Sequence, residues 1–349
     1  MSFEFPAWDP VLFDLPGPID VRWYGLTYVI GFVIASWIVG RLARRGFLPL
    51  EEGQVGDLMV WLLFGVILGG RFGYAVFYDQ SLLLPQNLLQ IWKGGMSFHG
   101  GLIGVFVAFL WFSAKYKLPW LRLGDSAAMC VTPGIFLVRF ANFINGELFG
   151  RIAPEGSKFG MRFPTDAAAT LNLGLQGLGG EVRSKELAIQ VAYGKREWAD
   201  VEAVMAKVDG AGRAIPWETI APKLDWERVA PLVPYRYPSQ LFEGLSEGLL
   251  LGLILWVVYR LTSKRPLAPG GYGGIFLAGY GIARFLLEYV RQPDAQFADA
   301  EDPVGTVLFG MTMGQTLSSV MVVAGIYFLV RGLRGRPAAV EPTASGAPA

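Results

Sequence analysis

Arginine, asparagine and glutamate side chains stand together in residues 138–147, at the end of an apolar segment long enough to cross a membrane. The polar members are Arg139, Asn142, Asn145 and Glu147. An ionisable side chain inside a membrane span costs about 2.5–3.5 kcal/mol on insertion scales, so its presence there indicates a function. Because the planar guanidinium group of arginine binds phosphate oxygens in pairs, this stretch predicts recognition of an anion such as a phosphate.

Comparable groups recur near one end of the other apolar segments. Arg284, Glu288 and Arg291 have the spacing i, i+4, i+7, which predicts that they share one helix face. The remaining groups are Tyr24, Arg71, His99 and Glu243. We therefore expect the helices that carry these side chains to bring them into one polar layer.

Composition places the chain in a membrane. Of the 349 residues, 53% are hydrophobic and 17% charged, whereas soluble domains carry about 25% charged residues. The net charge of +1 argues against a general affinity for nucleic acid. With one cysteine, Cys130, and one histidine, His99, the chain can form neither an intramolecular disulfide nor an HExxH zinc motif. We expect no metal, no other cofactor and no covalent nucleophile, so catalysis would have to be electrostatic.

Seven apolar runs of about 20 residues predict seven transmembrane helices. They cover residues 22–40, 57–78, 96–114, 126–146, 239–259, 272–291 and 312–331. Lysine and arginine cluster after the first, third, fifth and seventh runs. By the positive-inside rule this predicts an external N-terminus and a cytoplasmic C-terminus. The predicted fold class is an all-α polytopic membrane protein.

One long connection decides the predicted domain organisation. Residues 1–147 would form the first four helices with a site at the outer face, and residues 237–331 would form the last three. Residues 148–236 would be a small external head domain, since they carry mixed charge and no apolar run of membrane length. Residues 332–349, rich in Ala and Pro, are predicted to be a disordered cytoplasmic tail.

The predicted topology places the polar groups at one depth, near the headgroups of the outer leaflet. A transporter needs polar groups distributed through the membrane, with coupling sites near the midplane. One polar layer with four arginines instead suits an enzyme or a receptor for an anionic lipid. A non-catalytic binder or transporter of anionic lipid is the alternative. It would share the arginines but would not need His99 beside them.

Simpler roles stay open for several of these residues taken singly. Arg291 could extend its guanidinium group to the membrane surface, and Glu288 could serve only as an ion-pair partner within its own helix. His99 could be a packing residue. Asn142 and Asn145 could form hydrogen bonds between helices.

Five motifs occur in an order that points to one family. They read SFHGGLIG at 97–104, NFINGE at 142–147, YPSQLFE at 237–243, YGIAR at 280–284 and EYVRQPD at 288–294. The shorter motifs WYG at 23–25 and GGR at 69–71 fit as well. Over about residues 8–331 the chain resembles the bacterial prolipoprotein diacylglyceryl transferases.

The resemblance implies an enzyme of the bacterial cytoplasmic (inner) membrane that transfers the diacylglyceryl group of phosphatidylglycerol to the lipobox cysteine thiol of a prolipoprotein. The products would be a thioether and glycerol 1-phosphate, in the first step of lipoprotein maturation. Arg139 and Arg284 would bind the phosphate and act in catalysis, and His99 would be the general base. The expected substrate-binding residues are Tyr24, Arg71, Asn142, Asn145, Glu147, Glu243, Tyr280, Glu288 and Arg291.

Three positions depart from the family pattern, namely Val138, Ala141 and Tyr237. Residues 138–142 read VRFAN where the family usually has GRxGN, so larger side chains would narrow or shift the expected lipid pocket. Tyr237 stands where many relatives have histidine, which leaves His99 as the only imidazole of the chain.

Overall fold

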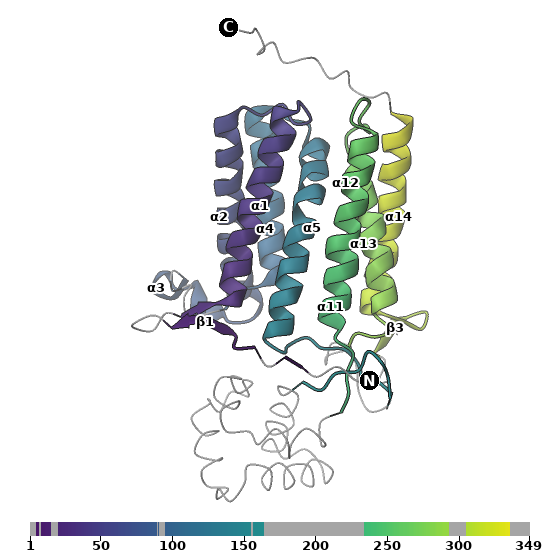
Figure 1. Cartoon of the computed structure of the whole chain (residues 1–349). Helices are drawn as coiled ribbons and strands as arrows, with labels where there is room; N and C mark the ends of the chain where they lie inside the picture. The colour runs from purple at the N-terminus through teal and green to yellow at the C-terminus, as the bar shows by residue number, and fades with distance from the viewer. Residues whose placement is uncertain are drawn as a thin grey trace, which may run out of the picture. The chain divides into compact units, whose positions relative to one another are not determined.

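Helices make up all of the long elements in the computed structural model (Figure 1), which describes residues 5–6, 8–14, 20–88, 90, 95–154, 156–163, 234–292 and 305–335. In chain order the elements are β1 (Val11–Asp14), β2 (Asp20–Arg22), α1 (Trp23–Arg44), α2 (Glu52–Phe77), the 3₁₀ turn η1 (Gln80–Leu83), α3 (Pro85–Leu88), α4 (Phe98–Tyr116), α5 (Trp120–Ile144), α11 (Ser239–Glu243), the π-helical turn η5 (Gly244–Leu250), α12 (Leu251–Leu261), α13 (Gly271–Leu287), β3 (Thr306–Leu308), β4 (Met311–Thr312) and α14 (Met313–Arg334).

Each of the seven predicted spans coincides with a helix in the described part of the chain. Five helical stretches have the length and apolar composition of a membrane span, namely α1, α2, α5, the run from α11 through η5 to α12, and α14. The other two are α4, with 19 residues, and the shorter apolar helix α13, with 17. The protein is therefore mostly helical and multi-pass, while the number of seven spans stays a prediction.

Most helix boundaries differ from those predicted by a few residues, and three of the differences have a physical reason. Helix α5 begins at Trp120 rather than at residue 126, because it contains the buried pair Arg122 and Asp125, which an apolar run does not include. Helix α13 ends at Leu287 rather than at residue 291, shortly before Gln292 and Pro293, where proline disfavours helical backbone. Helix α14 continues to Arg334, into the predicted tail, and two arginines in its last turn complement the helix dipole.

The chain divides into two compact units. The first unit comprises Met1–Tyr28, Ile135–Glu247 and Ala283–Ser318, and the second comprises Val29–Gly134, Gly248–Ile282 and Ser319–Ala349. Residues 164–233 of the predicted head domain and 336–349 of the predicted tail lie outside the described residues.

Glycines bring helices α2 and α4 of the second unit into close contact. Gly65, Gly69 and Gly73 lie one turn apart in α2 and face Gly100 and Gly104 in α4. A Cβ atom on Gly65 would lie 2.7 Å from the carbonyl oxygen of Gly104, and one on Gly73 would lie 2.6 Å from the Cα atom of Gly100. Small residues permit such backbone contact, which drives helix association where lipid removes the hydrophobic effect.

We expect Gly104→Leu to destabilise the protein by about 1–3 kcal/mol, since the added side chain overpacks the contact between α2 and α4. The measurement is the fraction that stays monodisperse on size-exclusion chromatography after heating in detergent. Gly56→Leu is the matched control because nothing lies within 4 Å of a Cβ atom there. Similar heat resistance of the two variants would show that the glycine contact does not hold these helices together.

A buried polar cluster fixes the start of α13 in the second unit. Asp125, which is fully buried, accepts hydrogen bonds from the backbone N–H groups of Gly270 (3.0 Å) and Gly273 (2.8 Å) and pairs with Arg122 (3.2 Å). Arg122 also donates to the carbonyl oxygen of Leu267 (2.9 Å). All of these groups are buried, and their mutual bonding offsets the cost of removing them from water.

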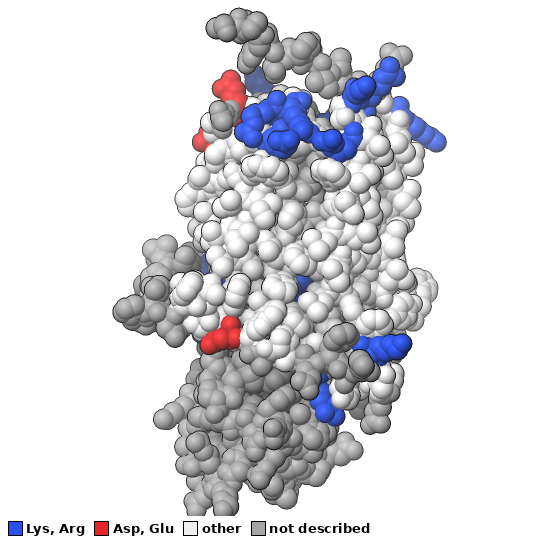
Figure 2. All heavy atoms as spheres, viewed as in Figure 1, with Lys and Arg blue, Asp and Glu red and all other residues white. Residues whose placement is uncertain are grey.

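Basic residues end four helices of the second unit. The last turns carry Arg41 and Arg44 in α1, Lys115 in α4, Arg260 in α12, and Arg331 and Arg334 in α14. Figure 2 shows lysine and arginine side chains gathered at one end of this unit. Side chains such as Trp37, Leu68 and Val323 are more than half exposed along the helices, as expected of surfaces that face lipid.

The first unit joins three chain segments through backbone bridges. Gly150 pairs with Arg291, and Ile152 and Met161 both pair with Arg236. Phe143, at the end of α5, packs in a buried cluster with Met161 and with neighbouring aromatic rings. The end of α5, the start of α11 and the segment after α13 are thereby held together, and these are the segments that carry the predicted polar residues.

Candidate functional site

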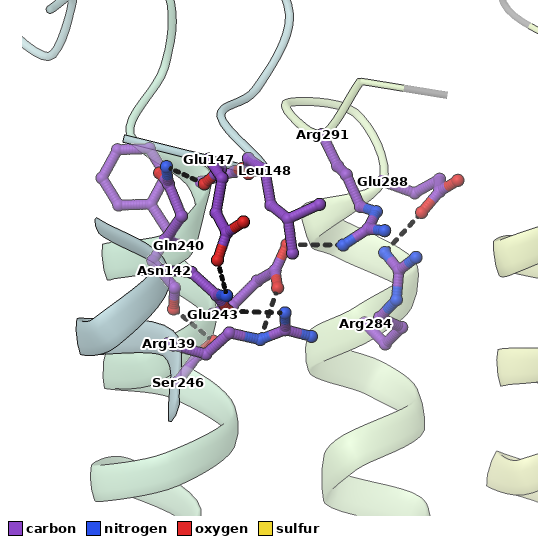
Figure 3. A network of polar contacts seen from close by, with 12 residues as sticks. Arg139, Asn142, Glu147, Leu148, Gln240, Glu243, Ser246, Arg284, Glu288 and Arg291 are labelled. Atoms are coloured by element: carbon purple, nitrogen blue, oxygen red, sulfur yellow. Dashed lines mark hydrogen bonds and ion pairs between the residues drawn. The ribbon is translucent and has the colours of Figure 1, made fainter. Parts of the chain in front are cut away.

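Glu243 joins two arginines in the first unit (Figure 3). Its Oε2 atom lies 2.8 Å from Nε of Arg139 in α5, and its Oε1 atom lies 3.2 Å from Nη1 of Arg291. The Glu243 side chain is 1% exposed, whereas the two arginine side chains are 21% and 19% exposed. Glu243 therefore orients both guanidinium groups while each keeps part of its surface accessible.

Arg291 does not lie on the helix face predicted for it. Helix α13 ends at Leu287, and the backbone bridge with Gly150 fixes the position of Arg291. Its side chain forms an ion pair with the buried carboxylate of Glu243.

Arg284 pairs with Glu288 one turn further along, as the i, i+4 spacing predicts. Glu288 is more than an ion-pair partner, because its Oε1 atom also accepts a hydrogen bond from Oγ1 of Thr312 (3.0 Å). Thr312 and Gln315 bond reciprocally at the start of α14, where each backbone N–H donates to the other side chain at 3.1 Å. Glu288 thus holds Arg284 in place and is itself held by a capped helix end.

Asn142, Asn145 and Glu147 form a local network at the end of α5. Asn142 donates to Glu147 at 2.8 Å, Asn145 donates to the same carboxylate at 3.2 Å, and Nη1 of Arg139 donates to Asn142 at 3.4 Å. These bonds lie within the end of α5 and the turn that follows, so they do not join separate helices. The asparagines instead orient the Arg139 side chain and shape the turn.

Tyr24 lies in the first turn of α1, within the first unit. Its ring packs on that of Tyr28 with the centroids 5.4 Å apart. Contact of Tyr24 with the arginines or with substrate stays a prediction.

Arg71, His99 and Tyr280 belong to the second unit. Arg71 is buried and donates to four backbone carbonyl groups of the segment between α2 and α4, including those of Leu88 (3.0 Å) and Asn87 (2.6 Å). These contacts show a loop-holding role, and contact of Arg71 with substrate stays a prediction. His99 is exposed in the first turn of α4, and Tyr280 stacks on Phe276 in α13.

The sequence reasoning missed Glu247. This residue is fully buried in η5, and it interacts electrostatically with Glu243, Arg139, Arg284 and Arg291. The available signal was a second carboxylate four residues after Glu243, within a predicted membrane span. These interactions also place the Arg139 and Arg284 pairs around one common carboxylate.

Three partly exposed arginines held by buried carboxylates are suited to bind an anion. Arg284 is 18% exposed, close to the values for Arg139 and Arg291. Guanidinium groups that are already oriented lose little entropy on binding and can stabilise charge that develops on a leaving phosphate. Among the described residues, no group of three or more His, Cys, Asp or Glu could hold a metal ion. Fold and site together define a multi-pass helical membrane protein in which three arginines are oriented by buried carboxylates.

Comparison with known proteins identifies the family. The family model for prolipoprotein diacylglyceryl transferase matches residues 10–331. Similar proteins named phosphatidylglycerol–prolipoprotein diacylglyceryl transferase include that of Rhodospirillum rubrum, 36% identical over 97% of this chain and 97% of the relative. Those of Ruegeria pomeroyi (36%; 94% and 96%) and Cronobacter sakazakii (35%; 96% and 96%) are likewise similar. The chain belongs to the prolipoprotein diacylglyceryl transferase family.

Proposed function

We propose that this protein transfers the diacylglyceryl group of phosphatidylglycerol to the lipobox cysteine thiol of a prolipoprotein, the first step of lipoprotein maturation. Membership of the family and the names of full-length relatives support this activity. The observation that carries it is the pair of oriented arginines, Arg139 on Glu243 and Arg284 on Glu288, around one site.

In the proposed reaction Arg139 and Arg284 bind the phosphodiester of the lipid. The thiol sulfur attacks the glycerol carbon that carries the phosphate, and the carbon–oxygen bond breaks as the carbon–sulfur bond forms. The bonding electrons leave on the phosphate oxygen, whose developing charge the arginines stabilise. His99 accepts the thiol proton, and glycerol 1-phosphate departs. Both fatty-acid esters stay intact, so the product is a thioether.

Incubation of the purified protein with phosphatidylglycerol and a lipobox peptide tests this activity. Mass spectrometry should show the peptide gaining one diacylglyceryl group through a thioether, with release of glycerol 1-phosphate. Cys130→Ala should keep full activity, since Cys130 is buried in the second unit and has no role in the proposed reaction. A thioester product, or a lipid adduct on the protein during turnover, would contradict this mechanism.

We further propose that the protein lies in the bacterial inner membrane with the site of the first unit toward the outside. The basic ends of α1, α4, α12 and α14 support this orientation, because positive charge favours the cytoplasmic side. Residues 148–236 would then form an external head domain and residues 336–349 a cytoplasmic tail.

Lys158→Cys in a Cys130→Ala background should react with a membrane-impermeant maleimide on intact cells or spheroplasts. The matched variant Lys264→Cys should react only after the membrane is permeabilised. Both lysines are exposed, so access to the reagent depends on the side of the membrane. The reverse pattern of labelling would invert the proposed topology.

A further inference from the structure

Glu247 is a buried carboxylate whose acceptor capacity is unused. Its side chain is 0% exposed, and neither carboxylate oxygen has a hydrogen-bond partner. It lies in η5, a π-helical turn between α11 and α12, and such turns inside helices occur frequently at functional sites. Leaving a buried charged group unpaired is costly, so an acceptor kept in this state requires an explanation.

The other buried carboxylates of the site are already occupied. Glu243 accepts from Arg139 and Arg291, one on each oxygen, and Glu288 pairs with Arg284 and Thr312 in the same way. Glu247 follows Glu243 by four residues, about one helical turn, which places the two carboxylates on nearly the same helix face. Within the described part of the first unit, Glu247 is therefore a buried carboxylate near the three arginines, and neither of its oxygens has a hydrogen-bond partner.

The proposed lipid substrate has two kinds of polar group for such a site. Its phosphodiester only accepts hydrogen bonds, and the arginines only donate them. Its headgroup glycerol carries two hydroxyl groups that need acceptors once they leave water. A phosphate held by Arg139 and Arg284 would bring the attached glycerol toward Glu247, whose two buried oxygens have no partner among the described residues.

We infer that Glu247 accepts hydrogen bonds from the hydroxyl groups of the headgroup glycerol and thereby makes the site specific for phosphatidylglycerol. This inference rests on the proposed transfer activity and adds a residue that selects the lipid. Because Glu247 is shielded from solvent, water does not replace a missing hydroxyl donor. A lipid without these hydroxyls leaves the carboxylate unpaired, and sites of this kind reject such analogues strongly.

The test compares two lipid donors that yield the same diacylglyceryl peptide. Dioleoyl phosphatidylglycerol carries both hydroxyl groups, and dioleoyl phosphatidylpropanol carries neither. For the wild type we expect kcat/KM to be about 10–100-fold higher with phosphatidylglycerol. Glu247→Leu, which has no acceptor, should lower kcat/KM for phosphatidylglycerol much more than kcat/KM for phosphatidylpropanol, so that the two values converge. The preference is the ratio of kcat/KM for phosphatidylglycerol to kcat/KM for phosphatidylpropanol. Glu247→Gln keeps one acceptor oxygen and should reduce this ratio several-fold.

Ser246→Ala is the matched control. Ser246 lies next to Glu247 in η5, but its hydroxyl donates to the carbonyl oxygen of Phe242 (2.7 Å) in its own helix, so the variant should keep the wild-type ratio. Size-exclusion chromatography shows whether each variant folds. If Glu247→Leu does not fold, the lipid preference of Glu247→Gln tests the inference instead. An unchanged ratio in the Glu247 variants, an equal fall for both lipids, or no preference in the wild type overturns the inference alone. A wild type that transfers from neither lipid overturns the proposed function as well.

Discussion

Arg139→Lys and Arg284→Lys are each expected to lower turnover about 10²–10³-fold, the usual effect of losing one donor to developing charge. Lysine keeps the positive charge but presents a compact ammonium group, which cannot make paired hydrogen bonds to phosphate oxygens. It also loses the geometry in which Nε of Arg139 pairs with Glu243 at 2.8 Å. The measurement is the rate of diacylglyceryl transfer at saturating phosphatidylglycerol.

Arg41→Lys is the control for these variants. Arg41 lies in the last turn of α1 in the second unit, is exposed and has its guanidinium carbon 5.8 Å from the ring centroid of Trp37, so its replacement should leave turnover unchanged. Near-wild-type turnover in both Arg139→Lys and Arg284→Lys would refute the proposal that a pair of guanidinium groups holds the phosphate.

His99→Gln is expected to slow transfer strongly at neutral pH, by about 10²–10⁴-fold if His99 is the general base. Glutamine can form hydrogen bonds but does not accept a proton at this pH. A cysteine thiol has a pKa near 8.5, so only a few per cent is thiolate at pH 7. Raising the pH increases the thiolate fraction, and it should therefore partly restore transfer by the variant.

The transfer rate of wild type and His99→Gln is to be measured from about pH 6 to pH 9.5, which brackets the thiol pKa. The ratio of the wild-type transfer rate to that of His99→Gln should fall as the pH rises and the thiol ionises. A constant ratio of the two rates over the whole range would show that His99 is not the general base.

The positions of the helices are the part of the fold that the sequence predicts well. Each predicted span coincides with a helix because a membrane-length apolar run must satisfy its own backbone hydrogen bonds in lipid. The predicted ends of the helices are less accurate, as the start of α5 shows. Hydropathy registers Arg122 and Asp125 as polar residues outside a span, whereas they are buried and bonded to each other.

Local spacing predicts the contacts between near neighbours in the chain. The pairing of Arg284 with Glu288 follows from an i, i+4 interval, and the structure confirms it. The same reasoning is wrong for Arg291, because it assumes that α13 continues to that residue. The helix ends at Leu287, where the interval ceases to describe a common face.

Contacts between distant residues were decided by the tertiary structure alone. A sequence shows that Arg139, Glu243 and Arg291 are costly to bury, but it does not show that one carboxylate serves both arginines. It equally cannot distinguish Arg71, whose guanidinium group is occupied by loop carbonyls, from the arginines of the site. Chain segments far apart meet only through packing, and packing also leaves Glu247 buried with unpaired oxygens. The sequence by itself therefore determined the helices, the family and the charged residues, because these depend on composition and local order. The partner of each charge depends on which helix faces meet, and only the folded chain decides that.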